Sequence, residues 1–157
     1  MTRTFPLQSL LDLSQMRLDE AARKLGKLIA GEQEASKRRE ILIQYREEYR
    51  ARFVAAAQNG LGPLEWQNYS SFLARLDEAI VQADSAIVHT QQRTSAGQKE
   101  WLNKHGRLQA FNTLSDRHQT RVAHQDQRRE QKTLDEITAR KQSEKSNEDD
   151  WELDQER

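Results

Sequence analysis

The chain has 157 residues, of which 32% are charged and 35% hydrophobic, with 25 basic and 25 acidic side chains. So large a charged share leaves few apolar side chains for the core of a globular enzyme and favours an extended helical protein. The zero formal net charge disfavours a general nucleic-acid binder, and the absence of cysteine excludes a disulfide framework and thiolate chemistry.

The first predicted helix covers residues 4–58. Thr4 and Pro6 suit its start, because proline lacks an N–H that the first helical turn would leave unpaired. Apolar or small side chains then recur at heptad spacing, which places one narrow stripe along a helix. The stripe consists of Leu7, Ser14, Ala21, Leu28, Ala35, Leu42, Tyr49 and Ala56, flanked by Leu11, Leu18 and Leu25.

A turn is predicted at residues 59–62. The pair Asn59-Gly60 readily adopts the left-handed conformation that ends a helix, and Gly62-Pro63 is typical of the start of the next one. A connection this short requires the two helices to lie side by side and antiparallel.

The second predicted helix covers residues 63–141. Its stripe consists of Trp66, Leu73, Ile80, Ile87, Trp101, Leu108 and Val122, with a weaker column that starts at Tyr69. We therefore expect an all-α fold, a long two-helix antiparallel coiled-coil hairpin over residues 1–141. A turn centred on residue 61 places Leu25 opposite Gly97 and Tyr49 near Phe72.

Residues 123–141 have no partner in the first helix and form an overhanging C-terminal helix, which is marginal in water unless a partner holds it. Residues 142–157 are expected to be a disordered acidic tail, because the stretch Glu144–Arg157 carries seven acids and two bases. Within it, Trp151 and Leu153 are either a small docking motif or solvated residues.

The sequence contains no recognisable catalytic or metal-binding pattern. No two histidines have the i, i+4 spacing that aims two imidazoles at one metal. The stretch Gly60-Leu61-Gly62 lacks the other residues of a phosphate-binding loop. We therefore expect no enzymatic activity, no cofactor and no metal site.

One surface near the turn has more apolar side chains than a two-helix seam requires. There, the seam residues Leu42, Tyr49 and Leu76 are joined on one flank by Tyr45, Phe72 and Ala79. This widening predicts either an exposed patch for a partner or a locally thicker seam, and spacing alone does not separate the two.

The chain resembles the flagellar type III export protein FliJ family over about residues 1–140. The resemblance rests on the segment from Glu20 to Gly26 and on Leu42, Tyr45 and Tyr49 with their neighbours. It further rests on the ordered set Trp66, Asn68, Tyr69 and Phe72, and on Arg107 to Ala110.

The resemblance implies a cytoplasmic, non-enzymatic helper of flagellar protein export, peripheral at the inner face of the cell membrane through the export apparatus. Its implied partners are the export ATPase hexamer, the cytoplasmic domain of the export gate and the export chaperones, with no nucleic acid, and the free protein is expected to be a monomer. The family's gate-facing surface corresponds to Leu42, Tyr45, Tyr49, Phe72, Leu76 and Ala79. Two positions at its edge depart from the family's usual residues, Arg38 in place of Gln and Ala83 in place of His.

Two alternatives remain compatible with the sequence. A structural coiled-coil scaffold or oligomerising adaptor without ATPase coupling would explain the seams and leave the aromatic patch unused. A nucleic-acid-associated helical protein would use the basic residues between Arg121 and Arg129, although Asp126 interrupts them.

Overall fold

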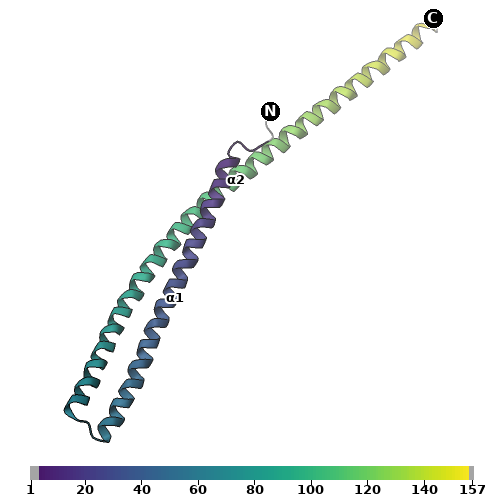
Figure 1. Cartoon of the computed structure of the whole chain (residues 1–157). Coiled ribbons are helices and arrows are strands. Elements are labelled where there is room, and N and C mark those ends of the chain that lie inside the picture. The colour runs from purple at the N-terminus through teal and green to yellow at the C-terminus, as the bar shows by residue number, and fades with distance from the viewer. Residues whose placement is uncertain (1–3, 156–157) are drawn as a thin grey trace. The chain divides into compact units, whose positions relative to one another are not determined.

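The chain folds as two long α-helices joined by a short turn, as a computed structural model shows (Figure 1). The structure describes residues 4–155, and the side chains of residues 4–147. Helix α1 spans Gln8–Gln58 and helix α2 spans Pro63–Gln155. The predicted all-α hairpin is confirmed.

The molecule divides into two compact units. The first unit, Leu13–Leu108, contains most of α1, the turn and the first half of α2, and here the two helices lie side by side and antiparallel (Figure 1). The second unit combines Met1–Asp12 with Gln109–Arg157.

The two helices end and begin near the turn at the residues predicted for this from the sequence. Gly60 has a φ of 88°, a left-handed conformation that glycine adopts without a steric penalty, and its N–H donates to the carbonyl of Ala57. Helix α2 begins at Pro63, and the N–H of Trp66 donates to the carbonyl of Gly62 at 3.0 Å.

Helix α1 begins at Gln8, four residues after the expected start at residue 4. The residues before it form a turn, in which the N–H of Gln8 donates to the carbonyl of Phe5 at 3.1 Å. Pro6 therefore lies in a turn that leads into the helix and not in its first helical turn.

The seam of the hairpin follows a heptad pattern, because every residue of the two columns below is buried or half-buried. In α1 the pattern runs through Leu11, Ser14, Leu18, Ala21, Leu25, Leu28, Glu32, Ala35, Arg39, Leu42, Arg46, Tyr49, Phe53 and Ala56. In α2 it runs from Tyr69 through Leu73, Leu76, Ile80, Ala83, Ile87, Thr90, Thr94, Gly97, Trp101, Lys104 and Leu108. The core is thin, and no large side chain in the described part of the chain is fully buried.

The salt bridges across the hairpin agree with the predicted register to within two residues. Arg46 Nε lies 3.1 Å from Asp77 Oδ1, and Lys24 Nζ lies 3.4 Å from Glu100 Oε2. Gly97 faces α1, because a Cβ added there would lie 3.5 Å from Leu25 Cδ1.

The second unit contains the chain's start and the far part of α2. Phe5 packs against His118 with ring centroids 5.7 Å apart, which ties the residues before α1 to α2. Beyond Asp126, every side chain from residue 127 to residue 147 is exposed, so this part of α2 has no covering helix among the described residues.

Helix α2 continues past Lys141, the boundary expected from composition, to Gln155. No glycine or proline follows Gly106 in the helix, so no residue there breaks the backbone pattern. Disorder of residues 142–157 in solution stays a prediction. The side chains of Trp151 and Leu153 lie outside the described residues.

Candidate partner-binding surface

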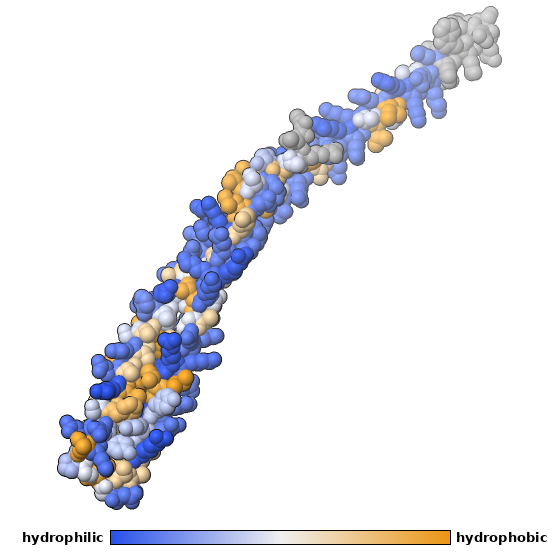
Figure 2. Space-filling model, in the orientation of Figure 1, coloured by the Kyte–Doolittle hydropathy of each residue, from blue (hydrophilic) through white to orange (hydrophobic). Residues whose placement is uncertain are grey.

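The six residues of the predicted surface all lie in the hairpin, on facing parts of the two helices. Leu42, Tyr45 and Tyr49 come from α1, and Phe72, Leu76 and Ala79 come from α2. Figure 2 shows hydrophobic side chains gathered over this part of the hairpin, bordered by hydrophilic ones.

These residues differ in how much side chain they expose. Tyr45 is 58% exposed and Phe72 is 41% exposed, whereas Leu76 is only 9% exposed. Leu42, Tyr49 and Ala79 are half-buried. Tyr45 and Phe72 therefore offer the large accessible rings, and the other residues mainly hold the two helices together beneath them.

Tyr49 contacts one of the two exposed rings and shares a helical face with the other. Its own ring lies 4.3 Å from that of Phe72, with an interplanar angle of 47°. Tyr45 precedes Tyr49 by four residues in the same helix, a spacing that puts the two side chains on one face. The rings of Tyr45 and Phe72 thus flank one half-buried tyrosine, and we call the six predicted residues the aromatic surface.

The aromatic surface continues toward the turn in a cluster that sequence reasoning missed in part. Phe53 packs against Trp66 at 4.9 Å and against Tyr69 at 5.5 Å, and Tyr69 also contacts Tyr49 at 5.2 Å. Phe53 lies one heptad after Arg46, so extending the heptad count beyond Tyr49 would have found it. These tilted ring pairs lock the two helices together just before the turn.

Salt bridges across the hairpin border the aromatic surface. Arg46 pairs with Asp77, and Arg39 pairs with Asp84 one heptad farther from the turn. Both arginines occupy seam positions, where their aliphatic stems cover apolar neighbours and their charged ends reach the flank.

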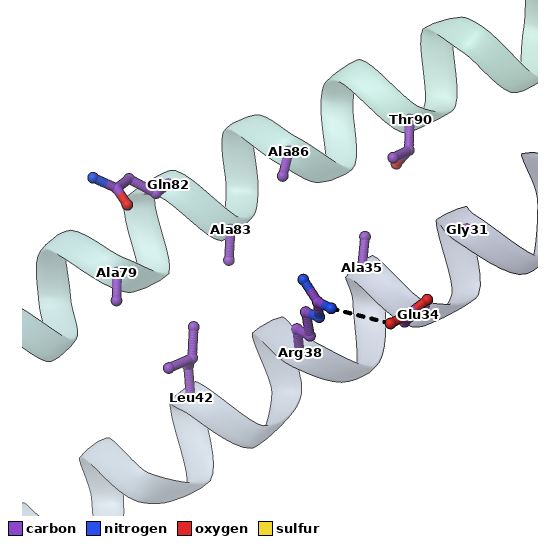
Figure 3. Close-up of a pocket in the computed structure, with 10 residues that line it drawn as sticks. All are labelled: Gly31, Glu34, Ala35, Arg38, Leu42, Ala79, Gln82, Ala83, Ala86 and Thr90. Atoms are coloured by element: carbon purple, nitrogen blue, oxygen red, sulfur yellow. Dashed lines mark hydrogen bonds and ion pairs between the residues drawn. The ribbon is translucent and has the colours of Figure 1, made fainter.

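Beside the aromatic surface, the hairpin has an open groove of about 510 Å³ (Figure 3). Leu42 and Ala79 of the aromatic surface line it, together with Gly31, Glu34, Ala35, Arg38, Gln82, Ala83, Ala86 and Thr90. Figure 3 shows Ala35 pointing toward α2 and Ala83 toward α1, so small side chains face each other and leave the space unfilled.

Arg38 and Ala83, the two positions expected at the edge of the predicted surface, both line this groove. Arg38 Nη2 donates to Glu34 Oε1 at 3.1 Å, so its charge is paired on its own helix. Ala83 has no polar side chain to present to a partner. At these two positions the groove therefore offers a paired charge and a hollow.

No arrangement for covalent chemistry accompanies these surfaces. Among the described residues, no group of three or more His, Cys, Asp and Glu side chains could hold a metal ion. None of the helices in the described part of the chain has a long enough run of apolar sequence to cross a bilayer.

The family model for the flagellar FliJ protein matches residues 3–147, which include the hairpin, the aromatic surface and most of α2. The chain belongs to the FliJ family. It is 35% identical to the flagellar FliJ protein of Salmonella typhi over 134 residues, which cover 85% of this chain and 91% of the relative. It is 33% identical to the flagellar FliJ protein of Escherichia coli (strain K12) over the same shares of both chains.

Membership in this family confirms the resemblance read from the motifs at Glu20 to Gly26 and around Trp66. It makes the chain a non-catalytic component of the flagellar export apparatus, which confirms the expectation that it is not an enzyme.

Proposed function

We propose that this protein is a stalk-like rod that links the export ATPase ring to the membrane export gate and escorts export chaperones. The observation that carries the proposal is the aromatic surface, where the exposed rings of Tyr45 and Phe72 flank Tyr49. Large aromatic rings over a packed base are the side chains that dominate the binding energy of protein interfaces. We assign this surface to the cytoplasmic domain of the export gate.

The proposed ATPase contact lies in the other unit of the chain. The side chains of residues 127–147 are all exposed, and Leu134 and Ile137 are 63% and 47% exposed. A single helix with no covering partner is marginal in water, so a surrounding ring would both bind and stabilise it. We assign this segment of α2, with the early turns of α1, to the ATPase ring.

The proposed mechanism has no covalent step. Contacts at the aromatic surface and at the far part of α2 would each favour one state of a partner, and the helix that both share would couple these preferences. Such a protein works in the cytoplasm and reaches the inner face of the membrane only through its partners.

The gate contact is tested with the double variant Tyr45→Ala and Phe72→Ala. We expect binding of the full-length chain to the purified cytoplasmic gate domain to weaken at least about tenfold, because two aromatic anchors are lost. Helical content by circular dichroism should stay the same, since both side chains are partly exposed and lie outside the seam columns. Titration calorimetry gives the affinity.

The matched control for this variant is Val81→Ala with Leu102→Ala. These two side chains are 67% and 60% exposed and lie in the same unit, away from the aromatic surface. The control should bind the gate domain as the unmodified chain does. If the Tyr45 and Phe72 double variant also binds unchanged, the aromatic surface is not the gate contact.

The ATPase contact is tested by hydrolysis. The purified chain should raise the rate of ATP hydrolysis by its cognate export ATPase, and a chain that ends at Asp126 should not. A chain that forms stable oligomers and leaves ATP hydrolysis unchanged would instead support the scaffold alternative.

A further inference from the structure

A second groove adjoins the one beside the aromatic surface. Its volume is about 280 Å³, and it is lined by Lys24, Lys27, Leu28, Gly31, Thr90 and Arg93. Gly31 and Thr90 line both grooves, so the two meet on the same side of the hairpin. Together they extend from Leu42 and Ala79, within the aromatic surface, to a basic end. We call this the extended groove.

The extended groove is hollow because its walls carry small side chains. In its wider part, Ala35 points toward α2 and Ala83 points toward α1 (Figure 3). A Cβ added at Gly31 would meet no atom within 4 Å, so the space beside this residue is open. The hollow therefore accepts large apolar side chains from another molecule without any movement of the two helices.

The charges along the extended groove are uneven. Near the aromatic surface, Arg38 is paired with Glu34. At the basic end, Lys24 Nζ lies 3.4 Å from Glu100 Oε2, but the side chains of Lys27 and Arg93 make no hydrogen bond or ion pair with another described residue. Two unpaired cations from opposite helices thus face one end of an apolar channel, where carboxylates on a partner would complement them.

A protein segment fits this arrangement better than a nucleic acid. A phosphate backbone needs cations along the whole contact, whereas here the unpaired cations lie at one end and the arginine at the other end, Arg38, is paired with Glu34. The apolar walls in between, formed by Ala35, Ala83 and Ala86, favour aliphatic or aromatic side chains.

We propose that the extended groove receives an amphipathic segment of the gate's cytoplasmic domain, with large apolar side chains between Ala35 and Ala86 and carboxylates at Lys27 and Arg93. This inference rests on the proposed function, because Leu42 and Ala79 belong to both surfaces. It adds the chemistry of the partner segment and the direction in which that segment lies on the hairpin.

The decisive variant is Gly31→Leu. The open space at Gly31 accommodates the new side chain, and leucine is a better helix former than glycine, so the hairpin should fold at least as stably as before. The leucine would occupy the place of the incoming segment, and we expect affinity for the purified gate domain to fall at least about tenfold.

Its matched control is Gly26→Leu. Gly26 lies in the same helix and also has open space around it, but it lines neither groove. Gly26→Leu should bind the gate domain within about twofold of the unmodified chain, as expected for a surface substitution outside an interface.

The charge contribution is tested separately with Lys27→Glu and Arg93→Glu combined. We expect weaker binding at low salt and a smaller difference from the unmodified chain as salt rises, because exposed charge pairs are screened. The control is Lys37→Glu. Lys37 lines a different groove, together with Ile29 and Thr94.

The outcomes separate this inference from the proposed function. If the Tyr45 and Phe72 double variant loses binding while Gly31→Leu and the charge variant bind normally, the gate contact stands and the extended groove is not part of it. If the unmodified chain does not bind the gate domain, the proposed function and this inference are both wrong. Loss of binding in Gly31→Leu and in the charge variant, with both controls unchanged, supports the inference.

Discussion

At the scale of single residues, Gly97 lies close against the facing helix α1. A Cβ added to this glycine would lie 2.7 Å from Leu28 Cδ1, closer than carbon atoms can approach without a shift. One turn before it, the hydroxyl of the buried Thr94 donates to the carbonyl of Leu28 at 3.4 Å. Glycine is thus retained inside α2 although it costs about 1 kcal/mol in a helix relative to alanine.

Gly97→Leu is expected to lower the free energy of unfolding by about 1–3 kcal/mol, because the added side chain overpacks the seam against Leu28. Gly106→Leu is the matched control, since nothing lies within 4 Å of a Cβ at Gly106. There the better helix propensity should raise stability by about 0.5–1 kcal/mol. Urea unfolding followed by circular dichroism measures both changes. Equal effects of the two variants would show that the helices are not tightly apposed at Gly97.

At the scale of elements, the relative position of α1 and α2 depends on charge as well as on apolar packing. Arg46 and Asp77 are 38% and 58% exposed at their side chains, so their pair is screened by water and contributes modestly. This salt bridge helps to set the register of the two helices, because sliding one helix along the other would leave Arg46 at the seam without its partner.

A double-mutant cycle on Arg46→Ala and Asp77→Ala should give a coupling energy of about 0.2–1 kcal/mol that decreases as salt is added. Arg46→Met separates charge from packing, because methionine keeps an unbranched apolar stem at the seam. Thermal unfolding at low and high salt provides the measurement. A coupling energy of zero at low salt would mean that this pair does not help to set the register.

The two parts of α2 differ in what supports them. In the hairpin, α2 packs its seam residues Leu76, Ile80 and Leu108 against α1, whereas the side chains of residues 127–147 are all exposed. Backbone amides of residues 127–147 should therefore exchange with deuterium far faster than those between Leu76 and Leu108. Hydrogen exchange with mass spectrometry on the full chain gives this comparison. Equal protection in the two parts would contradict the absence of a covering partner.

At the scale of the whole molecule, the stability of the free chain comes from a thin seam. Only Ala21, Leu76, Ile80 and Leu108 are deeply buried among the hydrophobic side chains that the structure describes. The exposed rings of Tyr45 and Phe72 add large side chains to the surface of the free chain, a feature typical of partner-binding surfaces.

The free chain is expected to be a monomer, because the two helices already cover each other's seams. Size exclusion with light scattering should return a mass near 18.3 kDa across a range of micromolar concentrations. A mass of twice this value that falls on dilution would favour the oligomerising scaffold, with the aromatic surface buried between two copies.

Much of the hairpin could be predicted from the sequence. Heptad spacing identified the seam, the Asn59-Gly60 pair located the turn, and the register followed from the position of that turn. These features are local or periodic, so they can be counted along the chain. The end of α2 was less predictable, because composition distinguishes acidic from apolar segments but does not set where a helix ends.

The sequence by itself determined the helices, their antiparallel packing and the set of residues near the turn, since chain spacing decides which side chains share a helical face. Only the tertiary structure decided which of those residues are accessible. Tyr45 and Phe72 project while Leu76 is covered, and small side chains on both helices leave a groove beside them. Exposure depends on the size of the side chains on the facing helix, and that information is distributed over two segments far apart in the chain.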